Sequence, residues 1–370
     1  MENRSFMAVE KETIHLHSID DCLGASEKRF FGGGYKRVGH RIRDIRVASD
    51  GAGTGFARAV ARLGYPADWS TKSGSRSLRP HLSTIDAAVL AIELAEIYLV
   101  CAFGLKEEQR RSMWLRRLVM KAGAEPQEDL TEFPVRAVHR GTDAGPSAGT
   151  TPRAATATGT AADPEARETW AFSELECQVG AIKVGLEIAH AAGNGGAATA
   201  ALWLADGFLG DPAGRFYGEG FRKRTQYIRD VTIDLASQQV TSLCDIVPDD
   251  PSDNYDEGFS GRFQPSVSAV DGIIVLAQLA QSLLYSLDRL DRSSSNTLWM
   301  RRVTLESTGP ERKLRGPFAV STAISRTRLL NFQGGVWRTS EWTADFHGIH
   351  FEYSLGHEIP ASELAMAEGS

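Results

Sequence analysis

The sequence predicts an α+β fold that the chain contains twice, each copy holding one long apolar helix against an antiparallel β-sheet. The first observation is segment 82–99, which is apolar on nearly all sides, as expected of a helix buried in a core. The second is a near-copy of this segment at 268–284, offset by 185 residues. The third is the same order of strand-like segments around each helix.

Further blocks of sequence recur in the same order. Trp114 begins a Trp-Leu-Arg-Arg-Leu segment that returns as Trp-Met-Arg-Arg-Val at Trp299, again 185 residues later. Upstream, the block 29–35 (Arg-Phe-Phe-Gly-Gly-Gly-Tyr) matches 215–221 at an offset of 186. Several blocks in one order at a near-constant offset indicate a duplicated domain.

Strands are predicted on both sides of each helix from runs of apolar residues bounded by turn residues. In the first copy they are 37–47, 55–65, 113–122, 133–139 and 172–190, the last as one long strand or a hairpin. In the second copy they are 225–235, 238–246, 299–308, 318–326 and a long pair around 336–355. This order is that of the hot-dog arrangement, so the predicted fold is a tandem (double) hot dog with two long central helices.

The repeat also predicts the domain boundaries. They are an N-terminal lead-in at 1–21, a first hot-dog repeat at 22–204, a second at 205–360 and a C-terminal tail at 361–370. Segment 141–166 is rich in Ala, Thr, Gly and Pro and almost lacks large apolar side chains. Such a segment cannot bury enough surface to become ordered, so it is predicted to be a disordered insertion.

Composition narrows the classes of function. The 370 residues carry 47 acidic and 41 basic side chains, and this formal net charge of −6 argues against a general nucleic-acid binder. The four cysteines form no CxxC motif, and we expect them to be reduced. The N-terminus lacks the apolar core of a signal peptide, and three carboxylates within 82–99 argue against a membrane span. A cytoplasmic protein without nucleic-acid or membrane partners is therefore expected.

Both predicted helices begin with the same pair of polar residues. Ser83 and Asp86 have the spacing of a capping box with Asp in place of Glu, and so do Ser268 and Asp271. The helix dipole stabilises a carboxylate at this position, which is one role for the two acids. The same helix end polarises a thioester carbonyl, so either Asp is also a candidate catalytic residue.

Four polar residues occur only in the first copy. Arg79, His81, Glu93 and Glu96 are replaced in the second by Gln264, Ser266, Gln278 and Gln281. Since charge costs free energy to bury, a half without chemistry loses little by neutralising it, and we predict one active cavity near the start of the first helix. There His81 is a candidate general base and Arg79 a candidate phosphate or carboxylate ligand. The alternatives are a loop histidine and, for the two glutamates, a hydrogen-bonded pair at the interface.

A family resemblance rests on two segments, Tyr65-Pro66-Ala67-Asp68-Trp69-Ser70 and Arg79-Pro80-His81-Leu82-Ser83-Thr84-Ile85-Asp86. They resemble the avirulence D (AvrD) family of plant-associated bacteria, and the Arg29-Phe30-Phe31-Gly32 block agrees. The resemblance runs from about Cys22 to about His357. Members of the family direct the synthesis of syringolides, acyl-sugar signals built from a β-ketoacyl chain and a ketopentose. The resemblance implies a biosynthetic enzyme, in which Asp68 and Trp69 are substrate contacts or loop anchors.

The predicted helices also resemble those of hot-dog fatty-acid dehydratases, which place an acid shortly after the helix start and a histidine before it. Asp86 and Asp271 occupy the acid position, and His81 precedes only the first helix. We therefore expect His81, Asp86 and Asp271 to be catalytic, and Arg79, Glu93, Asp68 and Trp69 to bind substrate.

The function favoured by these observations joins a β-ketoacyl thioester to a small ketose or polyol, by acyl transfer and then condensation with loss of water. The expected partners are an acyl chain carried on CoA or an acyl carrier protein and a ketose or sugar phosphate; a homodimer is compatible with the sequence. The alternatives are an acyl thioesterase or hydroxyacyl dehydratase, and a non-catalytic sensor of acyl chains or lactones. His347, His350 and His357 lack convincing metal-ligand spacing, and we expect neither a metal nor another cofactor.

Overall fold

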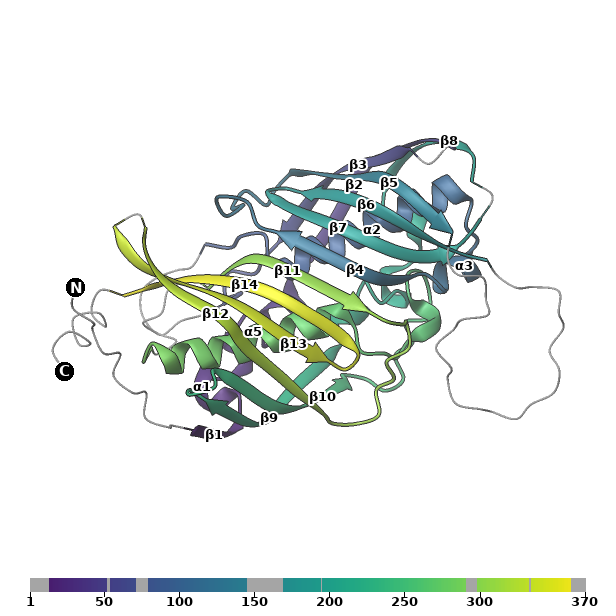
Figure 1. The fold of residues 1–370 in the computed structure, drawn as a ribbon. Coiled ribbons are helices and arrows are strands. Elements are labelled where there is room, and N and C mark those ends of the chain that lie inside the picture. Colours follow the sequence, from purple (N-terminus) through teal and green to yellow (C-terminus); the bar gives the residue numbers. More distant parts are fainter. Residues whose placement is uncertain are drawn as a thin grey trace.

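A computed structural model describes residues 13–51, 54–70, 79–144, 169–193, 195–290, 298–332 and 334–360. These residues form one antiparallel sheet of fourteen strands with two long helices, α2 (Thr84–Phe103) and α5 (Ala269–Leu287). The short helices are α1 (Asp20–Leu23), α3 (Glu107–Arg111) and α4 (Asp206–Leu209). Figure 1 shows α2 covered by one part of the sheet in the upper half of the view and α5 by the other part below.

Two groups of strands surround the two helices, and we call them the α2 half and the α5 half. The α2 half holds β2 (Gly39–Asp50), β3 (Gly55–Gly64), β4 (Trp114–Lys121), β5 (Phe133–Ala144), β6 (Trp170–Val179) and β7 (Ile182–Ala191). The α5 half holds β9 (Arg224–Asp234), β10 (Gln239–Pro248), β11 (Trp299–Ser307), β12 (Phe318–Phe332), β13 (Gly335–Phe346) and β14 (Ile349–Ile359). β4 pairs with β11 and joins the two halves into one sheet.

The predicted antiparallel sheet with few helices is confirmed, and most elements lie close to their expected positions. The two predicted helices are α2 and α5, and segment 172–190 is a hairpin of β6 and β7. The two long helices also contact each other. All residues from Ile85 to Leu99 are buried, as the apolar pattern of the segment predicts.

The backbone repeats in detail. Asp44 in β2 and Asp230 in β9 both have a left-handed backbone, with φ of 55° and 50°. The pairing register shifts between Leu115 and Arg117 in β4, and between their counterparts in β11. A β-bulge re-aims the side chains that follow it, so bulges at matching positions give the two halves the same curvature.

The first strand of each half is exchanged between halves. β1 (Thr13–Ser18) precedes the α2 half in sequence but pairs with β9 of the α5 half. β8 (Ala197–Leu204) precedes the α5 half but pairs with β2 of the α2 half. The sequence pattern predicted neither strand, and the described part of the lead-in at 1–21 is an ordered strand followed by a helical turn.

The predicted insertion at 141–166 starts within a strand, because β5 extends to Ala144. The remainder, residues 145–166, lies outside the described part of the chain.

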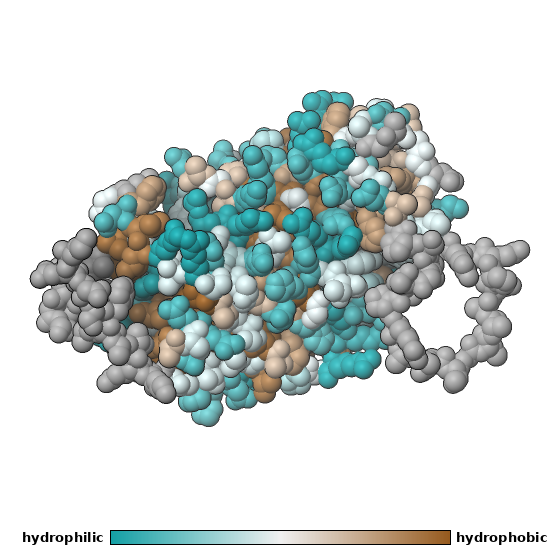
Figure 2. All heavy atoms as spheres, in the orientation of Figure 1, coloured by the Kyte–Doolittle hydropathy of each residue, from teal (hydrophilic) through white to brown (hydrophobic). Residues whose placement is uncertain are grey.

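Two apolar parts of the fold differ in exposure. α5 is long and apolar enough to cross a membrane by length and composition, but 78% of its most apolar window is buried inside the protein. Figure 2 shows mostly hydrophilic side chains on one face, with hydrophobic side chains gathered near the β12–β13 hairpin. Leu329, Leu330 and Phe332, at the end of β12, are about half exposed.

Candidate active site

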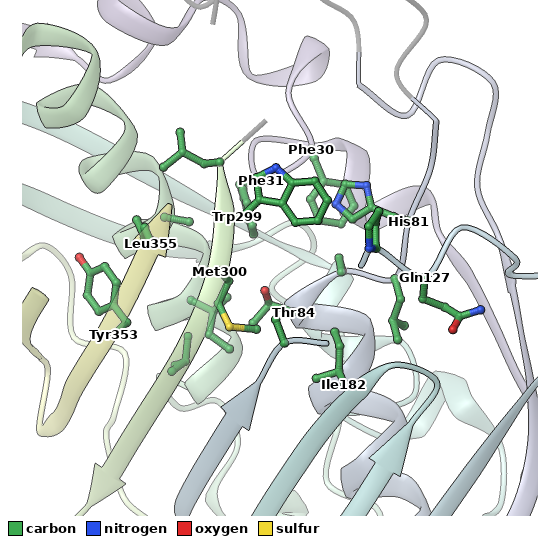
Figure 3. A pocket seen from close by; sticks show the side chains of 18 of the residues that line it. Phe30, Phe31, His81, Thr84, Gln127, Ile182, Trp299, Met300, Tyr353 and Leu355 are labelled. Atoms are coloured by element: carbon green, nitrogen blue, oxygen red, sulfur yellow. The ribbon is translucent and has the colours of Figure 1, made fainter. Parts of the chain in front are cut away.

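A cavity of about 220 Å³ lies between the two halves, against α5 and beside the start of α2. One wall comes from α5, β11 and β14 and contains Ile273, Ala277, Gln278, Trp299, Met300, Tyr353 and Leu355. The opposite wall comes from the first repeat and contains Arg29, Phe30, Phe31, Trp69, Arg79, His81, Ser83, Thr84, Gln127 and Ile182. Figure 3 shows His81 close to Trp299 at one end, with Met300 and Thr84 below them. The cavity is thus mostly apolar, with a few polar groups at defined places, as is typical of small-molecule sites.

His81 is held between two tryptophans. Its ring stacks on Trp299 of β11 at 6.2 Å and 10°, and meets Trp69 edge-on at 5.9 Å. Trp69 is buried, so two of the predicted site residues lie together in the cavity wall. Arg79 also lines the cavity, but its side chain is 82% exposed and, among the described residues, forms a long ion pair of 3.5 Å with Glu128.

Asp86 does not line the cavity. It accepts hydrogen bonds from Ser83 Oγ at 2.6 Å, from His40 Nε2 at 2.7 Å and from the Tyr65 hydroxyl. Burial opposes ionisation of Asp86, but the bonds from His40, Ser83 and Tyr65 outweigh it and lower the pKa of the carboxyl. Burial also lowers the pKa of His40, although its bond to Asp86 acts in the opposite direction. Asp86 is therefore an ionised capping residue held by His40 and Tyr65, and it does not contact His81.

Asp271 has the matching position in the α5 half and also lies outside the cavity lining. It forms the capping box with Ser268 and accepts bonds from Gln226 Nε2 at 2.8 Å and Arg224 Nη1 at 3.2 Å. Gln226 takes the place of His40, and Arg224 adds a buried positive charge that neutralises the carboxylate.

Glu93 and Glu96 are engaged in buried ion pairs away from the cavity. Arg215 Nη1 donates to Glu93 at 2.9 Å, and Arg110 Nη2 donates to Glu96 at 2.9 Å. Burial raises the pKa of Glu93 to about 7, with Arg215 pulling it down. Burial alone would lower the pKa of Arg215, but the charges of Glu93 and Glu96 raise it. The structure does not bring Glu93 together with His81.

The positions of the second repeat that correspond to the loop wall of this cavity enclose almost no space. A pocket of about 20 Å³ is lined by Tyr217, Gln264, Ser266, Val267, Ser268 and Ala269. These residues occupy the repeat positions of Phe31, Arg79, His81, Leu82, Ser83 and Thr84, which all line the large cavity. Phe259 packs on Tyr217 beside this pocket, and its backbone N–H bonds Glu96. Of these two matching sites, the open one is therefore the cavity against α5.

Arg29 is a charged residue of the cavity wall that sequence reasoning did not select as a site residue. Its side chain is 4% exposed and pairs with Asp20 at 2.5 Å. Its Nε and Nη1 atoms are buried and have no hydrogen-bond partner among the described residues. Burial lowers the pKa of Arg29, and Asp20 offsets this only in part. Its counterpart Arg215 pairs with Glu93, and Gln278 occupies the repeat position of Glu93. A comparison of the two repeats could therefore have identified Arg29 as an arginine that lacks its second acid.

The glycines after Arg29 allow a tight turn. A Cβ atom at Gly34 would lie 2.1 Å from the carbonyl oxygen of Trp69, and one at Gly32 would lie 2.2 Å from that of Ser26. Only glycine fits such close backbone approaches, and the turn places Phe30 and Phe31 against the cavity.

Asp68 is exposed and pairs with Arg37 at 2.8 Å, which fixes the loop that carries Trp69. Within the described ranges, no group of three His, Cys, Asp or Glu side chains is placed to hold a metal ion.

Several solved structures have a similar arrangement. They include a putative oleoyl thioesterase from Lactobacillus plantarum, with 10% identity, a TM-score of 0.34 and coverage of 84% of this chain and 100% of that one. A protein of unknown function with a hot dog fold from Alicyclobacillus acidocaldarius has 10% identity, a TM-score of 0.33 and coverage of 84% and 95%. GphF dehydratase 1 has 12% identity, a TM-score of 0.32 and coverage of 85% and 98%. TM-scores this low assign neither a reaction nor a substrate to this chain, and no curated protein matches its sequence.

Family membership follows from the sequence itself. A family model matches residues 14–360, which include both long helices and extend from β1 to β14. The model describes the Pseudomonas avirulence D protein, in agreement with the resemblance of the segments around Trp69 and His81. The protein therefore belongs to the avirulence D (AvrD) family.

Proposed function

We propose that this protein is a tandem hot-dog enzyme that joins a β-ketoacyl thioester to a small ketose in the cavity against α5. The observation that carries the proposal is an apolar cavity with one histidine and one incompletely paired arginine in its wall, in a chain of the AvrD family. The product class would be a syringolide- or butenolide-like signal. The protein would act in the cytoplasm on chains carried by CoA or an acyl carrier protein.

The apolar wall suits the acyl chain. Ile273, Met300 and Leu355 line it together with the aromatic rings of Phe31 and Tyr353. Burying a methylene group in such a wall contributes about 0.8 kcal/mol, so chain length is selected by the depth of the cavity. Arg79 is exposed and lines the cavity together with His81, and in this proposal it would bind the phosphate groups of CoA or of a carrier protein.

The chemistry requires one base and one electrophilic site. The carbon between the two carbonyls of a β-ketoacyl thioester is acidic, and His81 is the proposed base that removes its proton or activates the sugar hydroxyl. Thr84 lies at the first turn of α2, where the helix dipole polarises a carbonyl oxygen placed against it. Asp86 and Asp271 have a positioning role in this proposal, because they hold the starts of the two helices.

The purified protein with a β-ketoacyl thioester and a set of ketoses tests the proposal. Free thiol is measured by its colour reaction, and products are measured by mass spectrometry. The expected result is thiol release that depends on the ketose, with a product whose mass equals both reactants less the thiol, or less the thiol and water. Expression cultures compared with an empty vector provide the same measurement in cells.

The other outcomes identify the alternatives. Thiol release without a ketose indicates a thioesterase, and an enoyl product from a hydroxyacyl thioester indicates a dehydratase. Ligand binding without any turnover indicates a sensor. Each of these results would contradict the proposed joining reaction.

A further inference from the structure

We propose that Arg29 holds the enolate oxygen of the β-ketoacyl group inside the cavity against α5. The inference rests on the proposed function for its substrate class, but on the geometry of Arg29 for its site. It assigns to this buried arginine the stabilisation of the negative charge that forms when the carbon between the carbonyls loses its proton.

The α2 half shows which ligand such an arginine holds. Arg215, at the repeat position of Arg29, binds two carboxylates at once, Asp206 at 2.7 Å and Glu93 at 2.9 Å. Arg29 keeps the first of these interactions through Asp20, the counterpart of Asp206. The second carboxylate is replaced by the neutral side chain of Gln278, whose Nε2 donates to the carbonyl oxygens of Phe31 and Ile274.

One nitrogen atom of Arg29, Nη1, lacks the hydrogen bond that its counterpart in Arg215 makes. Nε is without a partner in both arginines, but Nη1 bonds Glu93 in Arg215 and has no partner among the described residues in Arg29. A buried N–H of a charged group left without an acceptor costs free energy, about 1–3 kcal/mol or more. Arg29 and Gln278 both line the cavity, and Nη1 is buried just behind that lining. A substrate oxygen that displaces the atoms covering Nη1 would supply the missing acceptor.

The charge of the ligand follows from the same comparison. Arg215 supports one further monoanion in addition to the half-exposed Asp206. A phosphate dianion in this buried place would need more than one guanidinium, since an unbalanced buried charge is costly. An enolate carries a single negative charge on oxygen, as does the Glu93 carboxylate. In the step, the C–H bond between the carbonyls breaks, its proton goes to His81, and its electron pair delocalises onto the carbonyl oxygens.

Binding of a small probe tests the inference without any ketose. The probe is the N-acetylcysteamine thioester of 3-oxooctanoic acid, and the control probe carries two methyl groups on the carbon between the carbonyls, so it cannot form an enolate. Calorimetry measures affinity, and the near-ultraviolet absorbance of the enolate reports its formation. Arg29→Gln is expected to lower the affinity for the first probe by about tenfold or more and to remove the enolate absorbance, while the affinity for the control probe stays the same.

A second variant adds the missing carboxylate to the protein itself. Gln278→Glu is expected to occupy Nη1 of Arg29, as Glu93 occupies Arg215, and so to abolish enolate formation while the melting temperature holds or rises. In the Arg29→Gln background the same substitution should lower the melting temperature, because the new carboxylate is then buried without a cation. This reversal of sign is a readout that does not depend on activity.

Four results would overturn the inference. The first is an equal loss of affinity for both probes in Arg29→Gln, and the second is unchanged enolate absorbance in either single variant. The third is binding of inorganic phosphate that depends on Arg29 and competes with the probe. The fourth is failure of the wild-type protein to bind the enolisable probe. Arg29-dependent enolate binding without any product from a ketose would instead contradict only the proposed joining reaction.

Discussion

The environments of α2 and α5 differ where their sequences differ most. Two buried ion pairs and Phe259 lie against α2, and the matching pocket beside the start of α5 measures only about 20 Å³. Against α5, the two glutamates are replaced by glutamines, and a cavity of about 220 Å³ is open. The difference teaches that, of these two matching sites, the more closely filled one is that whose helix keeps its glutamates paired with arginines. Ion pairs inside a core occupy space and fix their neighbours, whereas loss of an acid leaves its arginine available to a ligand.

The structure agrees with the sequence argument on the positions of two residues and differs on a third. Arg79 and His81 line the cavity near the start of α2, as expected from their occurrence in the first copy only. Glu93 was expected beside them for the same reason, but it binds Arg215 away from the cavity. Asymmetry between repeats marks functional divergence, yet it does not say on which side the reaction takes place.

The largest expected effect distinguishes the cavity against α5 from the nearly closed pocket at the matching position. His81→Ala should lower the rate of product formation by about 10²–10⁴-fold, because the cavity loses its proposed base. Ser266→Ala, at the repeat position of His81 beside the closed pocket, should leave the rate near the wild-type value. Both rates are measured from product formation by mass spectrometry, with melting temperatures to confirm folding. Equal rates for the two variants and the wild type would show that His81 is only a loop residue.

The next effect concerns stability. Glu93→Ala leaves the buried Arg215 with only the half-exposed Asp206 as its carboxylate and should reduce the free energy of unfolding by up to about 3–5 kcal/mol. Gln278→Ala removes two hydrogen bonds to backbone carbonyls from the corresponding position, and should cost only about 1 kcal/mol. Denaturant titrations measure both changes. A loss for Gln278→Ala as large as that for Glu93→Ala would contradict the view that α5 lines a cavity rather than a packed core.

A smaller effect compares two histidines at matching places in β7 and β14. His190 is fully buried beside Ser173, and burial lowers its pKa to about 4. A folded pKa below the unfolded value of about 6.5 means that the unfolded chain binds the proton first. Stability is thus complete above pH 6.5 and declines by up to about 3 kcal/mol as the pH falls to 4.

His190→Gln should flatten that decline, which thermal unfolding across the pH range measures. His357 instead bonds Asp288 at 2.8 Å, so His357→Gln serves as the control and should leave the decline in place. The assignment fails if the wild-type decline persists unchanged in His190→Gln.

The smallest effect concerns the connection that differs most between the halves. Residues 145–168 connect β5 to β6, whereas β12 and β13 are joined by a short turn. Deleting 145–168 and joining the strands with a short Gly-Ser linker should change the melting temperature little, because the segment has few large apolar side chains. A large fall in melting temperature would show that these residues contribute to the core.

Much of the fold could be predicted because the signals are local. The apolar helices, their capping boxes and the strand order are encoded in neighbouring residues, and the duplication reinforces each of them. The exchange of β1 and β8 could not be predicted, because strands of this length give no local sign of which half they join. The same limit concealed the contact between His40 and Asp86, which are 46 residues apart.

The most direct test of the central claim is a crystal structure with the dimethylated β-ketoacyl probe, which cannot react through an enolate. The account predicts electron density in the cavity against α5, with the acyl chain along Met300 and Leu355. Density against α2, in the place of the Glu93–Arg215 pair, or density only on the outer surface would contradict it.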